Sequence, residues 1–282
     1  MEHARENTFV PSGRTRIYPV VGDPIQQARS PSTMTRLFAA RGDDAIVVPM
    51  RVGTAALSPL FSALHGVSNI GGILVTVPHK RMAAGLCEGA TERARFLGSV
   101  NVVRRQAAGW YGDNTDGVGY LDGLRLRGFA IAGKTALLVG CGGAGAAIAF
   151  EILLRGATKL AIYDIDKARL QMFCSQLEER FPGRVAIGGI DPSGFDLVAN
   201  ATPMGMRPDD PPPVDLAKLA PEQFVACAVT EPAVTPLIAA ARARGCRTMT
   251  GVEMFDAQAG TLADFLQCNM TDGDVVQPNR VD

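Results

Sequence analysis

Short runs rich in β-branched residues alternate with Ala- and Leu-rich stretches along most of the chain, and this alternation constrains the fold more than any other feature. RIYPVVG (16–22) precedes a helical stretch opened by Ser30 and Pro31, and DAIVVPM (44–50) precedes LSPLFSALHG (57–66). GGILVTVP (71–78) then precedes a helix that carries Lys80. Strands that alternate with helices predict a mostly parallel sheet with helices on both faces.

A second series of the same kind follows the helical stretch 115–128. Its expected strands are TALLVG, KLAIYD, RVAIGG, DLVANAT and FVACAV. Between the two series, residues 98–117 predict two short strands around a turn. We therefore expect an α/β protein of two domains with a central cleft, an N-terminal domain of residues 1–115 and a C-terminal domain of residues 116–251. The segment 270–282 is expected to be a loose tail.

Composition excludes several classes of function. The 282 residues carry 28 basic and 28 acidic side chains, so no charge excess favours nucleic acid or a membrane surface. Three scattered histidines and six cysteines without close pairs predict no metal site and no disulfide framework. The apolar stretch 136–150 is too short for a membrane span, and the first residues have no secretory pattern. A soluble, cytoplasmic protein is expected.

A glycine-rich turn follows the strand TALLVG and opens a helix. Gly140, Gly142, Gly143 and Gly145 permit a tight turn and a close approach of the backbone to a pyrophosphate at a helix N-terminus, as in a Rossmann-type domain. Asp164 ends the next strand, 19 residues after Gly145. A carboxylate there hydrogen-bonds a ribose 2′-hydroxyl and repels a 2′-phosphate, and the first basic residue that follows Asp164 is Lys167. NAD is therefore the expected cofactor. The alternative is that Asp164 only caps the helix expected from Asp166.

A hydride-transferring enzyme needs a group that takes or gives the hydroxyl proton. Lys80 stands where the strand in VTVPHK (75–80) gives way to a helix, and GDNTDG (112–117) supplies Asp113 and Asp116 at the expected domain edge. Strand ends are where α/β proteins build their sites. A lysine near a helix start can also be only a solvated surface charge.

The chain resembles the shikimate dehydrogenase family through motifs that occur in the family's order and spacing. They are VTVPHK, GSVNVV, GDNTDG, GCGGAG, NATPMGM and GVEMFDAQA. The resemblance implies a nicotinamide-dependent enzyme that interconverts shikimate, quinate or a close cyclic polyol acid with its 3-dehydro ketone, with Lys80 and Asp116 as the catalytic pair. It implies a setting in aromatic amino acid biosynthesis, whereas NAD use favours the oxidative direction.

The same resemblance implies further contacts. Ser30, Thr76, Asn101 and Gln258 are expected to bind the substrate. Thr202, Met206 and Gly251 are expected to bind the cofactor. The final helix, 252–268, is expected to pack back onto the first domain. Taken one at a time, Thr76 is also an ordinary strand residue, Asn101 a turn former and Gln258 part of a solvated helix face. A small cyclic hydroxy acid is the expected partner of a monomer or homodimer.

The departures from the family pattern concentrate at the substrate. Where the family has G-x-P-x-x-H-S-x-S-P, this chain reads GDPIQQARSP (22–31), so Gln27 and Ala28 replace His and the first Ser. Loss of a hydroxyl that binds a charged oxygen costs about 1.5–3 kcal/mol, or roughly tenfold to a hundredfold in affinity. Arg29 or Gln27 is a candidate to hold the carboxylate instead. Other positions also depart from the pattern, namely Leu74, Val102, Cys227 and Thr230.

At the cofactor, NADP-using members carry N-R-T where this chain has Asp164, Ile165 and Asp166. The dehydrogenase reaction is thus expected to be retained, and the selectivity for substrate and cofactor is expected to be altered. One alternative is a catalytically weak protein that senses NAD or a shikimate-type ligand on the same fold. Another is an unrelated two-domain dehydrogenase, which would give Lys80 and Asp116 no shared role.

Overall fold

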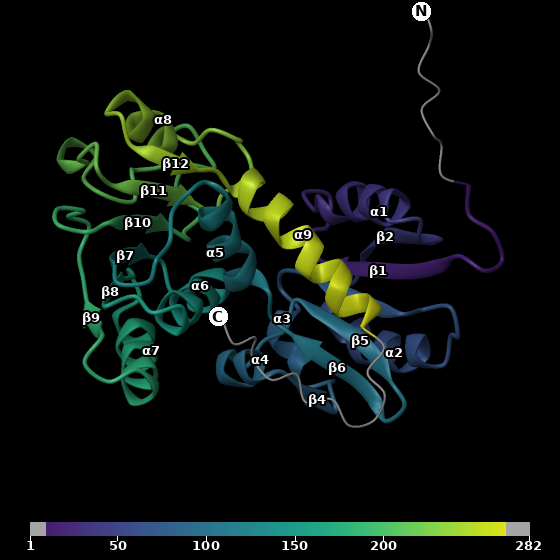
Figure 1. Cartoon of the computed structure of the whole chain (residues 1–282). Coiled ribbons are helices and arrows are strands. Elements are labelled where there is room, and N and C mark those ends of the chain that lie inside the picture. Colours follow the sequence, from purple (N-terminus) through teal and green to yellow (C-terminus); the bar gives the residue numbers. More distant parts are fainter. Residues whose placement is uncertain (1–9, 269–282) are drawn as a thin grey trace, which may run out of the picture.

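The computed structural model describes residues 10–268, and these residues form two six-stranded sheets, each with its own helices (Figure 1). The predicted α/β class is confirmed. The predicted C-terminal tail lies outside the described residues. In the view of Figure 1, the purple-to-teal N-terminal sheet and the green C-terminal sheet lie in separate halves of the molecule.

The first sheet has the strand order β2-β1-β3-β5-β6-β4. Its strands are β1 (Arg16–Gly22), β2 (Ala45–Arg51), β3 (Gly72–Val75), β4 (Gly89–Ala90), β5 (Val102–Gln106) and β6 (Gly109–Asp113). β1 runs parallel to β2 and β3, whereas β5 is antiparallel to both β3 and β6. This sheet is therefore mixed rather than mostly parallel, because the tight turn between β5 and β6 can join only antiparallel neighbours.

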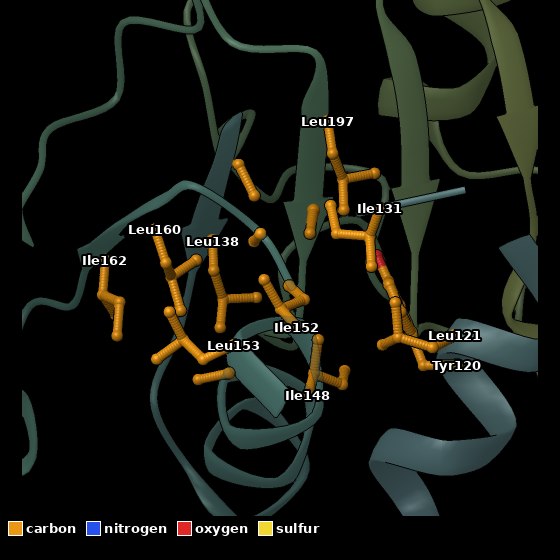
Figure 2. Close-up of a cluster of buried hydrophobic side chains, with 14 of the residues drawn as sticks. Tyr120, Leu121, Ile131, Leu138, Ile148, Ile152, Leu153, Leu160, Ile162 and Leu197 are labelled. Carbon is orange, nitrogen blue, oxygen red and sulfur yellow. The ribbon is translucent and has the colours of Figure 1, made fainter. Parts of the chain in front are cut away.

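The second sheet is parallel throughout, with the order β12-β11-β10-β7-β8-β9. Its strands are β7 (Thr135–Val139), β8 (Lys159–Tyr163), β9 (Val185–Ile187), β10 (Leu197–Asn200), β11 (Phe224–Cys227) and β12 (Arg247–Met249). The core beneath it packs Leu138 and Leu160 of the sheet against Ile148 and Ile152 of a covering helix (Figure 2). A parallel sheet covered in this way positions ligands at the carboxyl ends of its strands.

The helices cover these sheets and connect their strands. They are α1 (Ser30–Ala40), α2 (Thr54–His65), α3 (Lys80–Ala84), α4 (Glu92–Leu97), α5 (Asp116–Leu126), α6 (Gly143–Leu154), α7 (Lys167–Arg180), α8 (Pro236–Ala243) and α9 (Gly251–Gln267), with a 3₁₀ turn η1 (Leu216–Lys218). β4, α4 and η1 were not expected from the sequence, because each is too short to show a hydrophobic period.

Helix α9 connects the two halves of the molecule. It begins at Gly251 rather than at residue 252, because Thr250 caps it and forms a capping box with Glu253. Ala259, Leu262 and Leu266 of α9 lie in the same core cluster as Tyr18 of the first sheet. In Figure 1, α9 runs as the yellow helix from beside α5 across to β1 and β5. Residues near the middle of α9 are therefore placed where the two halves meet.

Gly117 allows α5 to approach α6 closely. A Cβ atom at this position would lie 2.2 Å from the carbonyl oxygen of Ala147 in α6. We expect Gly117→Ala to lower the free energy of unfolding by about 1–3 kcal/mol or more, because neither backbone can yield without repacking. Urea unfolding measures the loss. Gly260→Ala is the matched control, because Gly260 also lies within a helix and the nearest atom to a Cβ there is the Arg41 Nη2 at 3.9 Å. An equal effect of the two substitutions would contradict the close-approach argument.

Candidate active site

A cavity of about 230 Å³ lies at the junction of the two halves. It is lined from the first half by the start of α1, the end of β3 and the turn that follows it, and from the second half by Thr230 and α9. All the predicted catalytic and substrate-binding residues line it, namely Ser30, Thr76, Lys80, Asn101, Asp116 and Gln258. Residues spread over more than two hundred positions of sequence are thus brought to a single cavity.

Lys80 and Asp116 form an ion pair in this cavity. Lys80 is the first residue of α3 and Asp116 the first of α5, and the Lys80 Nζ lies 2.5 Å from the Asp116 Oδ2. The exposed fractions of the two side chains are 20% and 9%. The ion pair holds the Lys80 ammonium group in a fixed position beside the cavity, and a proton-transfer group requires such a fixed position.

The Asp116 carboxylate is held at both oxygens. Its Oδ1 accepts hydrogen bonds from the Asn101 Nδ2 at 2.7 Å and the Gln258 Nε2 at 3.2 Å. Burial by itself would raise the pKa of Asp116, but the Lys80 charge and the hydrogen bonds from Lys80, Gln258 and Asn101 together bring that pKa below its ordinary value. Asp116 is therefore ionised at neutral pH and stabilises a cation at Lys80.

Asn101 lines the cavity, and its side-chain amide hydrogen-bonds to other residues of the protein. Its Nδ2 donates to Asp116 and to the Thr115 Oγ1, and its Oδ1 accepts from the Thr115 backbone N–H at 3.0 Å. Because both ends of the amide are engaged within the protein, Asn101 serves to position Asp116 in this structure. Gln258 also donates to Thr115 and Asp116, but its Oε1 accepts no hydrogen bond from the described residues.

Three hydroxyl groups line the cavity without engaging the protein. The Ser30, Thr76 and Thr230 side chains all border it, and none makes a hydrogen bond to another residue between 10 and 268. Ser30 is only 7% exposed. Because buried polar groups normally have partners, such hydroxyls are suited to a polar ligand.

His79 supports the turn that carries Lys80. Its ring is 1% exposed, and its Nε2 lies 2.6 Å from the carbonyl oxygen of Val52 in the connection between β2 and α2. A carbonyl oxygen only accepts, so the Nε2 carries the proton in this contact. His79 thus ties the turn to the rest of the first half, a role that sequence position alone did not reveal.

A second cavity, of about 340 Å³, lies at the carboxyl ends of the parallel strands. Gly140, Gly142, Asp164 and Thr202 line it, as expected of cofactor-binding residues. A Cβ at Gly142 or Gly143 would meet no atom within 4 Å, whereas one at Gly145 would lie 2.0 Å from the Gly140 oxygen. The turn is therefore closely packed on its inner side and open on its outer side, next to the N-terminus of α6. This arrangement fits the pyrophosphate of a dinucleotide.

Arg169 is the main residue of this cavity that sequence reasoning missed. It stands in the first turn of α7, and its Nη2 lies 2.8 Å from the Asp164 Oδ1. Asp164 also accepts from the Cys141 and Asp166 backbone N–H groups. Burial opposes ionisation of Asp164, but these backbone bonds and the bond from Arg169 lower its pKa to about 2. Asp166, rather than Asp164, caps α7, through a bond from the Arg169 backbone N–H. The signal that could have revealed Arg169 is its place in the first turn of that helix, close in sequence to Asp164.

The remaining predicted cofactor residues lie apart from the cavity lining. Met206 is 55% exposed and does not border the cavity. Gly251 is buried at the start of α9, where a Cβ would lie 2.3 Å from the carbonyl oxygen of Val229. In this structure Gly251 therefore permits a close approach of two backbone segments.

Other structural features of the described chain bear on ligand classes. Between residues 10 and 268 no group of three His, Cys, Asp or Glu side chains is arranged to hold a metal ion. Within the same range, no helix has the length and apolar character needed to cross a membrane.

A parallel sheet with a glycine turn at one cavity, together with a separate cavity that holds the Lys80–Asp116 ion pair, defines a dinucleotide-binding oxidoreductase. Residues 20–103 match the family described as the shikimate dehydrogenase substrate binding domain. The chain is 35% identical over 251 residues to shikimate dehydrogenase (NADP(+)) of Rhodospirillum rubrum, covering 86% of this chain and 88% of that relative. The chain belongs to the shikimate/quinate dehydrogenase family, whose members act on a CH–OH group with a nicotinamide dinucleotide.

Solved structures show the same fold. The ligand-free 5-ketofructose reductase of Gluconobacter sp. strain CHM43 is similar with a TM-score of 0.84 and 26% identity, covering 91% of this chain and 94% of that one. Quinate dehydrogenase from Corynebacterium glutamicum, in complex with NAD, is similar with a TM-score of 0.80 and 28% identity, covering 90% and 94%.

Proposed function

We propose that the protein is an NAD-dependent dehydrogenase that interconverts shikimate, quinate or a close cyclic polyol acid and its 3-dehydro ketone. The observation that carries this proposal is the Lys80–Asp116 ion pair, which borders a cavity with three unengaged hydroxyl groups. A cyclic polyol offers several hydroxyls to such a lining, and a cavity of about 230 Å³ has room for one ring of this size.

In the oxidative direction, the Lys80 Nζ acts as the neutral amine and takes the proton of the reacting hydroxyl, which makes it an ammonium group. In the reductive direction, the Lys80 ammonium gives that proton to the carbonyl oxygen. Asp116 keeps the Nζ in place throughout, and Asn101 and Gln258 keep Asp116 in place. Ser30 and Thr76 orient the ring through its other oxygens. The bound nicotinamide supplies the hydride acceptor or donor.

The cofactor preference that we propose is NAD over NADP. It is supported by the nearly buried Asp164 carboxylate on the cavity that fits the dinucleotide. A carboxylate there accepts a bond from a ribose 2′-hydroxyl and repels a 2′-phosphate. The curated shikimate dehydrogenase from Rhodospirillum rubrum is named for NADP, whereas the quinate dehydrogenase structure contains NAD. Thr202 and the glycines of the turn complete the proposed site.

We propose that each of the two domains supplies most of one of the two cavities. Residues 1–115 form the substrate and catalytic domain, onto which α9 packs, and residues 116–251 form the cofactor domain. Gly251 stays a proposed cofactor contact, and in the structure it forms the start of α9.

A second candidate substrate is a neutral polyol or keto sugar. It is favoured by the apolar residues Ala28 and Leu74 at positions where the family pattern has polar ones, and by the likeness to 5-ketofructose reductase. The alternative to an enzymatic function is a catalytically weak protein that senses the same ligands.

The test is NADH or NADPH formation at 340 nm with shikimate and with quinate, each offered with NAD and with NADP. We expect saturable turnover with NAD and one of the acids. A higher kcat/KM with NADP would contradict the cofactor proposal. Tight binding of NAD without turnover of either acid would contradict the substrate proposal and favour the neutral substrate or the sensor.

A further inference from the structure

Two cationic side chains line the substrate cavity, Arg29 and Lys80. Lys80 is neutralised by Asp116. Arg29 makes no ion pair or side-chain hydrogen bond with any residue between 10 and 268, and the acidic side chain nearest to it in sequence, Asp23, pairs with Arg51. As an exposed residue that still borders the cavity, Arg29 lies at its rim. The cavity therefore has one cation with no counter-charge among the described residues.

The groups next to Arg29 also favour an anion. Ser30, the next residue, is only 7% exposed. It borders the cavity, and its hydroxyl has no hydrogen-bond partner among the described residues. Arg29 is the N-cap of α1, an 11-residue helix whose first turn carries no acidic side chain. The N–H groups of a first helical turn lack intrahelical acceptors and carry a partial positive charge. Three features of different origin thus converge on the same end of the cavity.

Gln27 is the other candidate to bind an anion, but its side chain hydrogen-bonds within the protein. Gln27 also borders the cavity, but its Nε2 donates to the carbonyl oxygen of Pro24 at 3.0 Å. Ala28 offers no polar atom in its side chain. Of the residues from 27 to 30, Arg29 and Ser30 are therefore the ones whose side-chain donors are not bound to any of the described residues.

We propose that Arg29 is a specificity-determining residue that binds the substrate carboxylate together with Ser30, in place of the hydroxyl that Ala28 lacks. This inference rests on the proposed function and names the residue that selects an acid as the substrate. A guanidinium presents paired N–H donors that match a carboxylate, and such charge-assisted hydrogen bonds are stronger than the neutral bond that a serine would offer. The substrate is then an anionic ring compound whose charge lies at the α1 end of the cavity.

The experiment compares the wild type with Arg29→Ala, Arg29→Lys and Arg36→Ala on shikimate, on quinate and on their methyl esters, with NAD. Arg36 is an exposed arginine of the same helix that does not border the cavity, so it controls for the loss of a surface charge. We expect Arg29→Ala to raise KM for the acid about tenfold to a hundredfold with little change in kcat. Arg29→Lys should recover part of the loss. The esters should be poor substrates of every variant, with a KM that Arg29→Ala leaves unchanged.

The result that overturns the inference is a KM for the acid that is the same in Arg29→Ala and the wild type. Activity of both proteins would then leave the proposed function in place. If no acid is turned over, calorimetric titration with shikimate and its methyl ester still decides. If the wild type binds shikimate and Arg29→Ala binds it about tenfold more weakly, the anion site is supported although the proposed reaction fails. Equal binding by both proteins, or no binding of shikimate by the wild type, overturns the inference.

Discussion

Replacing Lys80 by alanine is expected to lower kcat by a factor of about 10² or more, with little change in the affinity for NAD. The factor follows from the usual contribution of a positioned proton-transfer group. Lys80 borders the substrate cavity, and its Nζ reaches Asp116 at 2.5 Å, whereas the dinucleotide cavity is lined by other residues. Steady-state rates with the best acid, together with NAD titration by fluorescence or calorimetry, measure the two effects separately.

Loss of the ammonium group also leaves Asp116 charged and without its cation in a nearly buried position, which can itself destabilise the protein. Lys80→Gln addresses this, because its amide can still donate to Asp116 but cannot carry the reacting proton. Lys159→Ala is the matched control, since Lys159 is exposed at the start of β8 and borders neither cavity. Near-normal kcat in Lys80→Gln, in a folded protein, would remove Lys80 from the reaction.

The double substitution Asp164→Asn with Ile165→Arg is expected to shift the ratio of kcat/KM for NADP over NAD by a factor of about 10²–10⁴. Two effects of about 1.5–3 kcal/mol each combine to this range. The asparagine removes the charge that repels a 2′-phosphate and releases Arg169, which now pairs with Asp164. Ile165 is 80% exposed and lines the dinucleotide cavity, so an arginine there can reach the phosphate without displacing the core.

Asparagine is chosen because its side-chain oxygen can still accept a hydrogen bond from the Cys141 N–H. Thermal unfolding of the variant shows whether the turn is preserved. Asp209→Asn provides the control, because Asp209 is an exposed carboxylate that does not border the cavity. An unchanged cofactor ratio in a folded double variant would show that Asp164 and Ile165 do not select the cofactor.

Much of the candidate site could be predicted because its chemistry is carried by short motifs at chain positions of obvious structural meaning. Lys80 follows a strand, Asp116 opens a helix, and Gly140 to Gly145 join a strand to a helix. Such junctions are read from local pattern alone. Family resemblance then brought these positions together, and the structure lines a single cavity with Lys80, Asp116 and the four predicted substrate-binding residues.

The contacts that were missed depend on side chains from different elements. Arg169 pairs with Asp164 from the first turn of α7, and the Asn101 amide hydrogen-bonds to Thr115 and Asp116. Sequence spacing shows that a residue lies near a site but not which atoms it satisfies. The partner of a buried polar group is decided by every element packed around it.

The sequence by itself predicted the α/β class, the parallel second sheet and the glycine turn, because periodicity and glycine placement are local properties of the chain. The family resemblance added the residues that we propose for the reacting centre. Only the tertiary structure decided the mixed order of the first sheet and the pairing of Asp164 with Arg169. It also left Arg29 unpaired among the described residues at the rim of the substrate cavity. The physical reason is that strand pairing, burial and charge pairing depend on which distant segments meet, and these contacts exist only in the folded chain.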